Sequence, residues 1–440
     1  MLGVTRGAAL YVGALIGPGL LLVPSLATQA AGPATIIAWA GLLVLSLPLA
    51  ITFAALGVRH PVSGGVSAYV EEGFGSTAAA ITGVSFMAAV IFAVPAVSLI
   101  GGYYVADLTG SGTSVAVGVA FVIVSVVFGA NALGLRVSSG FQLALSAVLV
   151  GVVTVAVAVA LPSRATHNWT PFAPHGWWAI GTAANILMWL FFGWEAMAQL
   201  ADDFRDPSRD LPVAVALAFA VVAVLYVALA VATITVTAGS GSRVPLADLI
   251  AVGFGRAGRD ATAVLAVALT MGTGNVYTAG TAKLSASLAQ AGALPRWLGG
   301  DAERSVPRRP LAALAVTTAV ILAALVAGVI SAAALVRATS ACFILVYVLA
   351  LASAVRISSG ALRAAAVVAL GLICVVGVFS SWYLFVPAVA ALLSIGFRQI
   401  AKRHGQRLRD HQDQVGARPT LVALDASDKG APRQPKGGHP

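Results

Sequence analysis

The chain has 440 residues, of which 59% are hydrophobic and only 10% are charged. A soluble domain carries about 25% charged residues, so this chain cannot cover a water-facing surface. The formal net charge is +10. Because the basic residues gather in alternate loops between apolar runs, we interpret this charge as a sign of membrane topology and not of nucleic-acid binding. The sequence therefore predicts an all-α membrane protein.

Twelve apolar runs follow one another along the chain, each near the roughly 20 residues that a membrane-spanning helix needs. Together they predict one polytopic transmembrane domain over residues 1–397. The runs lie at approximately 7–30, 34–57, 78–106, 112–132, 140–161, 178–200, 212–237, 261–288, 310–330, 333–355, 362–379 and 381–397.

The basic residues of the loops are unevenly shared between the two sides of the membrane. If the N-terminus is cytoplasmic, most of them lie in the cytoplasm, and both termini do so as well. The exceptions on the other side are Arg164, Arg243, Arg256, Arg259 and Arg337.

Three segments outside the runs carry predictions of their own. The connection 58–77 is mildly amphipathic after Pro61, which predicts a short helix along the membrane surface or a re-entrant element. Residues 245–254, on the outer side, predict either a short helix over the access path or an ordinary loop. The tail, 398–440, is polar and lacks apolar periodicity. We expect it to be cytoplasmic and disordered after a short basic stretch that can lie against anionic lipid.

The first apolar run contains a helix-breaking tripeptide, Gly17-Pro18-Gly19. Proline lacks an N–H and clashes with the preceding turn, so the helix is expected to unwind here. Gly13 and Gly17 also form a small-xxx-small pattern, whose alternative meaning is close contact between helices. That alternative does not account for Pro18. An unwound segment at membrane depth needs a protein-lined cavity around it.

The sixth run contains a second, weaker interruption, Phe191-Phe192-Gly193-Trp194-Glu195. Only Gly193 is a poor helix former, so an unwound segment and a continuous helix both stay open. Interruptions in two corresponding runs are typical of transporters with discontinuous helices, which bind substrate near the middle of the membrane.

The two interruptions together predict a receptor for a zwitterion. A half-helix that starts after Gly19 points its N–H groups at a carboxylate. Carbonyl groups freed near Leu15 and Ile16, and near Trp189 to Phe192, can accept hydrogen bonds from an ammonium group. Four aromatic residues would wall a pocket for an apolar side chain, with packing inside the bundle as their alternative role: Trp189, Phe191, Phe192 and Trp194.

Polar residues are scarce inside the runs. Glu195 is the only acid clearly inside one, which makes it a candidate for proton coupling; its alternative is a structural role, bonded to the backbone at the break. No cluster of metal ligands is visible, so we expect no metal, no cofactor and no catalytic site. Four side chains of the eighth run can line a pathway, bind a cation or satisfy their own backbone: Thr270, Thr273, Asn275 and Thr278.

Several motifs resemble, in a consistent order, those of the amino acid–polyamine–organocation (APC) superfamily of transporters. The resemblance covers about residues 5–397, and within the superfamily it is strongest to bacterial exporters of L-methionine and branched-chain amino acids. The motifs are Gly17-Pro18-Gly19 followed by Pro24, Pro61-Val-Ser63-Gly64-Gly65, Phe192-Gly193-Trp194-Glu195-Ala196, Phe204-Arg-Asp-Pro207-Ser-Arg209-Asp210-Leu-Pro212, and Ala291-Gly-Ala-Leu-Pro295 with Val306-Pro307.

The resemblance implies a LeuT-like fold in a bacterial inner membrane. This fold has a five-plus-five inverted repeat and two further helices, with helices 1 and 6 discontinuous. Gly17 to Gly19 would meet the substrate's carboxylate, and the carbonyls of Leu15, Trp189 and Phe192, beside Gly193, would meet its amine. Gating or proton coupling would fall to Trp189, Trp194 and Glu195.

Two positions depart from the superfamily's pattern. Members usually carry a residue with an N–H where this chain has Pro18, so the carboxylate would be held by Gly19 and Leu20 alone. The fifth run lacks the lysine that some proton-coupled relatives carry. This difference leaves the coupling ion open between H⁺, which we expect, and Na⁺.

We therefore expect a secondary active transporter of neutral, apolar amino acids of the methionine, leucine, isoleucine and valine class, working as a proton-coupled exporter. An uptake permease or exchanger for amino acids or amines is the alternative within the superfamily. A membrane-embedded enzyme would need a nucleophile and base at membrane depth, and none is visible. A sensor would need an appended signalling domain, for which the tail is too short. We expect a monomer or homodimer with no enzymatic activity and no nucleic-acid partner.

Overall fold

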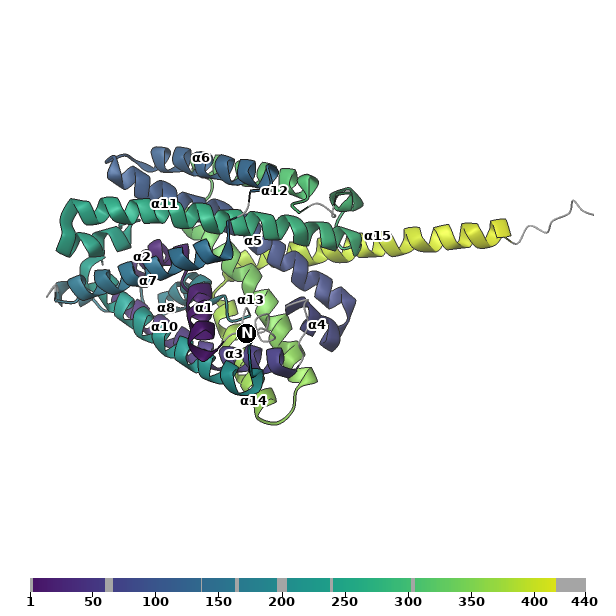
Figure 1. Cartoon of the computed structure of the whole chain (residues 1–440), viewed down its shortest axis with the longest axis horizontal. Coiled ribbons are helices and arrows are strands. Elements are labelled where there is room, and N and C mark those ends of the chain that lie inside the picture. Colours follow the sequence, from purple (N-terminus) through teal and green to yellow (C-terminus); the bar gives the residue numbers. More distant parts are fainter. Residues whose placement is uncertain are drawn as a thin grey trace, which may run out of the picture.

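A computed structural model describes residues 3–59, 66–135, 137–162, 166–195, 204–237, 240–301 and 305–416. All elements within these ranges are helices, labelled in Figure 1. The α-helices are α1 (Val4–Leu15), α2 (Val23–Ala31), α3 (Thr35–Arg59), α4 (Val66–Phe74), α5 (Ser76–Leu108), α6 (Thr113–Ala132), α7 (Ser139–Ala160), α8 (Ala179–Leu187), α10 (Pro207–Thr237), α11 (Pro245–Gln290), α12 (Arg308–Val326), α13 (Ala332–Ile357), α14 (Gly360–Val378) and α15 (Phe385–Gly416). Short 3₁₀ turns are η1 (Pro18–Leu21), η2 (Gly32–Ala34), η3 (Thr166–Trp169), η4 (Met188–Phe191), η6 (Arg296–Gly299) and η7 (Ser381–Leu384).

Within the described residues, 9 helical segments are long and apolar enough to cross a membrane. They correspond to nine of the twelve predicted runs. The other three, 7–30, 178–200 and 261–288, do not qualify. The first is interrupted after α1, the sixth is described as helix only over Ala179–Phe191, and the eighth is part of the long helix α11.

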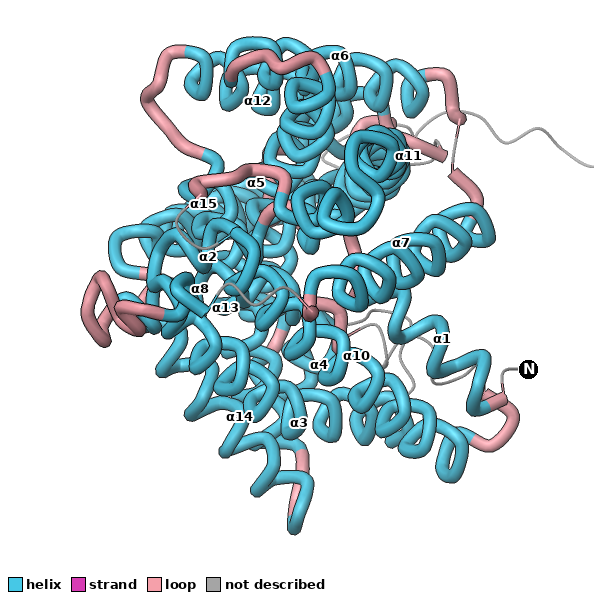
Figure 2. The backbone as a smooth tube through the Cα atoms, turned by 90° about the vertical axis from the view of Figure 1, so that its left-hand side faces the viewer, coloured by secondary structure: helices cyan, strands magenta, loops and turns pink. Residues whose placement is uncertain are grey.

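The helix α5 lies at the centre of the bundle and packs against α6, α11 and α13 (Figures 1 and 2). In its most apolar window 78% of the residues are buried, against 22% in α14 and 17% in the last span. The apolar side chains that α14 and α15 expose have no protein to cover them, and in a membrane protein such surface faces lipid. Central helices and lipid-facing helices are thus told apart by burial.

For two segments between the apolar runs, 58–77 and 245–254, the sequence left two alternative structures open. Both contain a helix in their described residues. The helix α4 occupies residues 66–74 of the connection 58–77, while its glycine motif at 60–65 lies outside the described residues. Farther along the chain, α11 begins at Pro245, so 245–254 is helical and not an ordinary loop. Gly255 then departs from helical geometry, with φ 55°, and separates this short arm from the rest of α11.

The start of α10 shows how local sequence fixes one of the motifs. Asp206 precedes Pro207, and its carboxylate accepts hydrogen bonds from the Ser208 hydroxyl at 2.6 Å and from the Arg209 N–H at 3.3 Å. This is an N-cap followed by proline at the first helical position. The Ser208 hydrogen bond lowers the pKa of the Asp206 carboxyl, so the cap is charged at neutral pH.

The last helix continues past residue 397, where the last apolar run ends. The helix α15 continues to Gly416 and projects beyond the rest of the bundle (Figure 1). Residues 398–416 contain no proline and many good helix formers, so nothing local stops the helix where the apolar run ends. Composition marks the end of the membrane span, whereas helix termination needs its own signal. Residues 417–440 of the predicted tail lie outside the described residues.

Candidate functional site

The first interruption is visible in the backbone. The helix α1 ends at Leu15, and Ile16 and Gly17 are extended, with ψ 98° and −175°. The chain then makes the turn η1 from Pro18 and re-enters a helix at Val23. Proline fits the first position of such a turn because its fixed φ suits the turn and its missing N–H needs no partner. The tripeptide therefore ends one helix and starts the next.

The second interruption has a different geometry. The helix α8 tightens into η4 after Leu187, Phe192 is extended with ψ 139°, and Gly193 has φ 132°. This positive φ is open to glycine and strained for other residues. The chain is described as far as Glu195, and residues 196–203 lie outside the described ranges.

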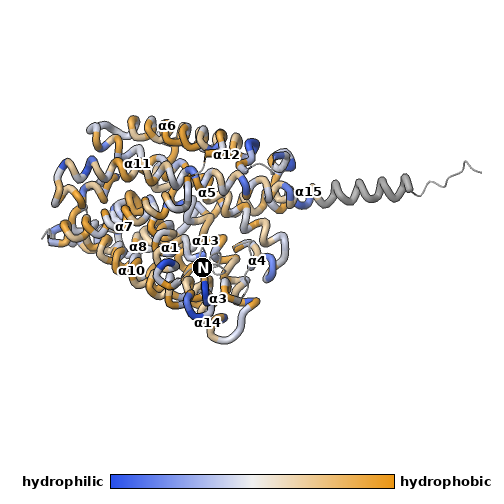
Figure 3. Tube along the Cα trace, in the orientation of Figure 1, coloured by the Kyte–Doolittle hydropathy of each residue, from blue (hydrophilic) through white to orange (hydrophobic). Residues whose placement is uncertain are grey.

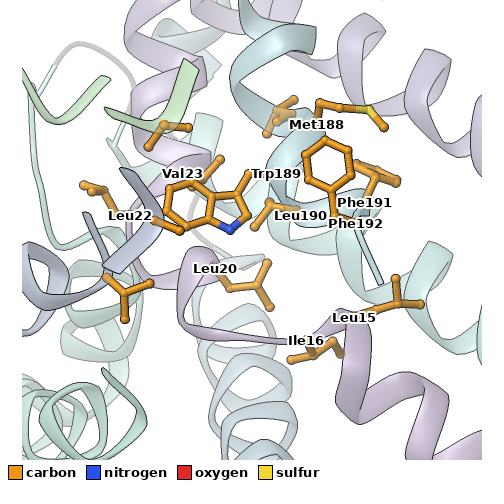
Figure 4. Packing of buried hydrophobic residues seen from close by; sticks show 14 of the residues in the cluster. Leu15, Ile16, Leu20, Leu22, Val23, Met188, Trp189, Leu190, Phe191 and Phe192 are labelled. Atoms are coloured by element: carbon orange, nitrogen blue, oxygen red, sulfur yellow. The ribbon is translucent and has the colours of Figure 1, made fainter. Parts of the chain in front are cut away.

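The two interruptions lie against each other, and their side chains interleave in Figure 4. A Cβ atom on Gly19 would lie 2.8 Å from Cδ2 of Leu190. A Cβ atom on Gly193 would lie 3.1 Å from the carbonyl oxygen of Ala14. Glycine at these two positions is what allows the broken segments to approach so closely.

Tyr226 of α10 joins the two broken segments. Its hydroxyl lies 3.1 Å from the Leu15 carbonyl and 2.8 Å from the Leu190 carbonyl, and its side chain is 1% exposed. One hydroxyl hydrogen is shared between two carbonyls that their own helices leave unpaired. The Leu15 carbonyl, predicted to be free for a substrate, thus has a protein partner. Because a carbonyl has two lone pairs, it keeps one further position.

A cavity of about 580 Å³ opens between the two interruptions. The helices α5, α11 and α13 complete its wall. The predicted site residues that line it are Leu15, Gly17, Pro18, Gly19, Trp189, Phe192, Gly193 and Glu195. The residues added by structure are Ala14, Leu190, Phe86, Val90, Val97, Val276, Tyr277, Gly280, Thr281 and Phe343.

Three predicted site residues do not line this cavity, because their side chains belong to the core. Ile16 is wholly buried. The Phe191 ring packs against Trp39 and Tyr226, with ring centroids 6.1 and 5.2 Å away. Trp194 donates from Nε1 to the Ser46 hydroxyl at 3.3 Å. Phe191 and Trp194 therefore pack inside the bundle, which was the alternative role stated for the aromatic residues.

The N–H groups at the first break can now be assigned. Leu20, predicted as a donor to a carboxylate, already donates its N–H to the Gly17 carbonyl at 3.1 Å. In the described hydrogen bonds the N–H groups of Gly17 and Gly19 have no backbone acceptor. The space where a Gly17 Cβ would stand is open to 4 Å. The two glycines, and not Leu20, are the donors left for a ligand.

Glu195 is held at the second break by two hydrogen bonds. Its carboxylate accepts from the Gly193 N–H at 2.9 Å and from the Tyr347 hydroxyl. Tyr347 is fully buried and packs edge-on against Phe192. The two hydrogen bonds are consistent with a structural role for Glu195 at the break. Its position on the cavity wall is consistent with a role in proton coupling.

The helix α11 contributes two hydroxyl-bearing cavity residues, Tyr277 and Thr281, that were not predicted from the sequence. They lie in the same stretch as the four predicted polar residues, Thr270, Thr273, Asn275 and Thr278. Tyr277 and Thr281 are one turn apart and line the cavity. Asn275 instead accepts from the Val137 N–H at 3.2 Å, and Thr270 donates to its own backbone at Val267. Tyr277 and Thr281 continue the series of hydroxyl-bearing residues in the eighth run, a signal that could have found the pair.

The fold and the cavity together indicate a class of protein, and comparison with known proteins gives its family. A helical chain with nine apolar spans in its described part and a cavity between two interruptions has the build of a multi-span membrane transporter. The family described as amino acid permease matches residues 2–397, so the chain belongs to the amino acid permease family. The superfamily resemblance stated from the motifs is thereby confirmed.

Three relatives illustrate the range of this family. The uncharacterized amino acid permease YecA of Bacillus subtilis (strain 168) is 32% identical over 419 residues, 92% of this chain and 97% of that protein. The L-methionine/branched-chain amino acid exporter YjeH of Escherichia coli (strain K12) is 30% identical over 217 residues, 49% of this chain and 51% of its own. The branched-chain amino acid permease BcaP of Bacillus subtilis (strain 168) is 28% identical over 224 residues, 47% and 48% of the two chains.

Glu195 is the one carboxylate among the residues that line the cavity. In the parts of the chain that the structure describes, no group of three or more His, Cys, Asp and Glu side chains comes together. The polar groups of the lining residues are backbone N–H and C=O groups, the hydroxyls of Tyr277 and Thr281, the indole N–H of Trp189 and the Glu195 carboxylate. Polar groups of this kind, set among apolar side chains, are typical of a cavity that binds a small molecule.

Proposed function

We propose that this protein is a secondary active transporter of neutral, apolar amino acids of the methionine, leucine, isoleucine and valine class. The observation that carries the proposal is the cavity of about 580 Å³ bordered by both helix interruptions. Such a cavity lets one substrate bind two broken helices at once, and relative movement of those helices can expose it to either side of the membrane.

Backbone groups at the two breaks would together recognise the two charges of the substrate. The Gly17 and Gly19 N–H groups suit a carboxylate because they have no backbone acceptor, and the positive end of the α2 dipole, which begins at Val23, also favours an anion there. The carbonyls of Leu15, Trp189 and Phe192 would accept from the ammonium group. Because this recognition uses backbone atoms, it is the same for every α-amino acid, and selectivity falls to the walls.

The walls favour an apolar side chain. Phe86, Phe192 and Phe343 line the cavity with Trp189 and Val90. Among its lining residues Glu195 is the one carboxylate, and Tyr347 and Gly193 already bond to it. A cationic side chain would therefore meet a single acid, already bonded at one oxygen, in an otherwise apolar wall, which favours a neutral side chain.

Export coupled to protons is the mode of transport that we infer. Glu195 supports it as an acid on the cavity wall, and the partial match to a methionine and branched-chain exporter supports outward transport. We also infer the LeuT-like arrangement, with twelve spans, an inverted repeat and both termini in the cytoplasm of a bacterial inner membrane, as a monomer or homodimer. Uptake or exchange is the second candidate, favoured by the partial match to a branched-chain permease.

Counterflow in proteoliposomes tests the substrate class. With unlabelled methionine or leucine inside, the purified protein is expected to accumulate the labelled amino acid, and arginine inside is expected to give no accumulation above empty liposomes. The direction of transport is then tested by placing the labelled substrate either inside or outside the liposomes. Each arrangement is measured with and without a pH gradient. Counterflow with arginine equal to that with methionine would contradict the inference that the cavity walls select apolar side chains. If methionine, leucine and arginine all give no counterflow, the assignment as an amino acid transporter is wrong.

A further inference from the structure

A second cavity, of about 550 Å³, lies at the end of the bundle that carries most of the basic loops. It sits between the C-terminal end of α11, the turn η6 and the helix α15, and it shares no lining residue with the transport cavity. Its described lining contains two arginines and no acid. The lining residues are Ala289, Gln290, Ala291, Gly292, Arg296, Gly299, Gly300, Arg398 and Ala401.

Arg398 is fixed in place with donors to spare. Its Nη1 donates to the Ser76 carbonyl at 2.9 Å, and its Nη2 donates to the Ser76 hydroxyl at 2.9 Å. Its Nε is buried and has no hydrogen-bond partner among the described groups. A guanidinium carries five N–H donors, so Arg398 presents a positive charge whose position is fixed and whose donors are incompletely used. Beyond the two contacts with Ser76, one N–H on Nη1 and one on Nη2 remain for a ligand.

A third guanidinium lies behind the glycine-lined wall. Arg309 donates from Nη1 to the Trp297 carbonyl at 3.2 Å, and this guanidinium occupies the place where a Cβ on Gly300 would stand. Gly292 has φ 73°, a conformation that favours glycine. The three glycines of the wall, Gly292, Gly299 and Gly300, thus let neighbouring side chains pack against its backbone, and at Gly300 the close neighbour is the Arg309 guanidinium.

The neighbours of this cavity are lipid-facing. Trp297 is 55% exposed, and on α15 Leu393 and Ile400 are 55% and 62% exposed. Tryptophan is enriched where a membrane meets water, and exposed leucine and isoleucine belong against acyl chains. Figure 3 shows the hydrophilic segments near α12 and α15 at the end of an otherwise hydrophobic bundle. The cavity therefore lies at the depth of lipid head groups.

We propose that this cavity binds the phosphate of an anionic membrane lipid, with Arg296 and Arg398 as its cationic ligands. Planar guanidinium groups match phosphate oxygens in pairs, and basic pockets between helices on the cytoplasmic side select anionic head groups. The exposed apolar face of α15 supplies the surface for an acyl chain. The bound lipid ties the end of α11, which also carries Tyr277 of the transport cavity, to α15.

Native mass spectrometry of the full-length protein in neutral detergent tests this site. Phosphatidylglycerol and phosphatidylcholine with identical acyl chains are added separately, and inorganic phosphate is added as a third ligand and as a competitor. Wild-type protein is expected to retain phosphatidylglycerol in preference to phosphatidylcholine. Arg296→Gln and Arg398→Gln are each expected to weaken that retention about fivefold, as the loss of one charge near the membrane surface predicts.

Two features of the design keep the outcome clear. Arg296 makes no described hydrogen bond, so its substitution tests the charge without removing a structural contact, and the exposed Arg363 supplies the matched control Arg363→Gln. Displacement of the lipid by inorganic phosphate in wild-type protein, but not in Arg296→Gln, would support the site and assign it to soluble phosphates too. Equal retention of the two lipids, or unchanged retention in both variants, would overturn the proposal.

Discussion

Replacing Gly193 with alanine is expected to lower transport roughly 10- to 100-fold while the protein still enters the membrane. Alanine at φ 132° is strained, and its Cβ would lie 3.1 Å from the Ala14 carbonyl and 3.2 Å from Cδ2 of Leu15. Such strain costs about 1–3 kcal/mol and is relieved only if the two interruptions separate, which takes apart the wall of the cavity. Methionine counterflow per reconstituted molecule measures the loss.

A matched control separates this effect from a general intolerance of larger residues. Gly118→Ala changes a helical glycine of α6, where nothing lies within 4 Å of the new Cβ. We expect Gly118→Ala to transport at the wild-type rate. Wild-type counterflow by Gly193→Ala would show that the close contact between the two breaks is not needed for transport.

Replacing Glu195 with glutamine is expected to abolish the dependence of transport on a proton gradient. The glutamine carbonyl can still accept from the Gly193 N–H and the Tyr347 hydroxyl, so the bonds at the break are kept and only the exchangeable charge is lost. The ratio of export rates with and without a pH gradient is expected to fall to about 1, as for removal of a coupling acid. Counterflow, which needs no gradient, is expected to continue.

The acid Glu71 provides the control for this prediction. It is exposed on α4 and away from both breaks, so Glu71→Gln should leave the ratio of export rates as in the wild type. If Glu195→Gln retains the full effect of a pH gradient, Glu195 has only its structural role. If counterflow is lost as well, the carboxylate is needed for the substrate cycle itself.

The first break could be predicted from sequence because its cause is local. Pro18 both removes an N–H and fixes a backbone angle, so neighbouring residues decide the outcome. At the second break only Gly193 gave a signal, and the sequence left a continuous helix open. The geometry there depends on Ala14, far away in the chain, whose carbonyl Gly193 approaches. No local pattern carries that information.

Contacts between distant segments account for the rest of what sequence missed. Tyr226 lies 211 residues from Leu15, and Tyr347 lies 152 residues from Glu195. An aromatic residue in a membrane span can line a cavity or fill the core, and periodicity does not separate these roles. Trp189 lines the cavity while Phe191, two residues on, packs into the core.

We propose that backbone groups at the two helix breaks bind both charges of an apolar amino acid. Competition against labelled leucine binding to the purified protein, with methionine, methioninamide and the deaminated acid 4-methylthiobutanoate, tests it most directly. We expect methionine to compete. Each analogue, lacking the carboxylate or the amine, is expected to compete at least about tenfold more weakly, since loss of one charged hydrogen-bond partner costs about 1.5–3 kcal/mol. Methioninamide competing as well as methionine would contradict the role given to Gly17 and Gly19.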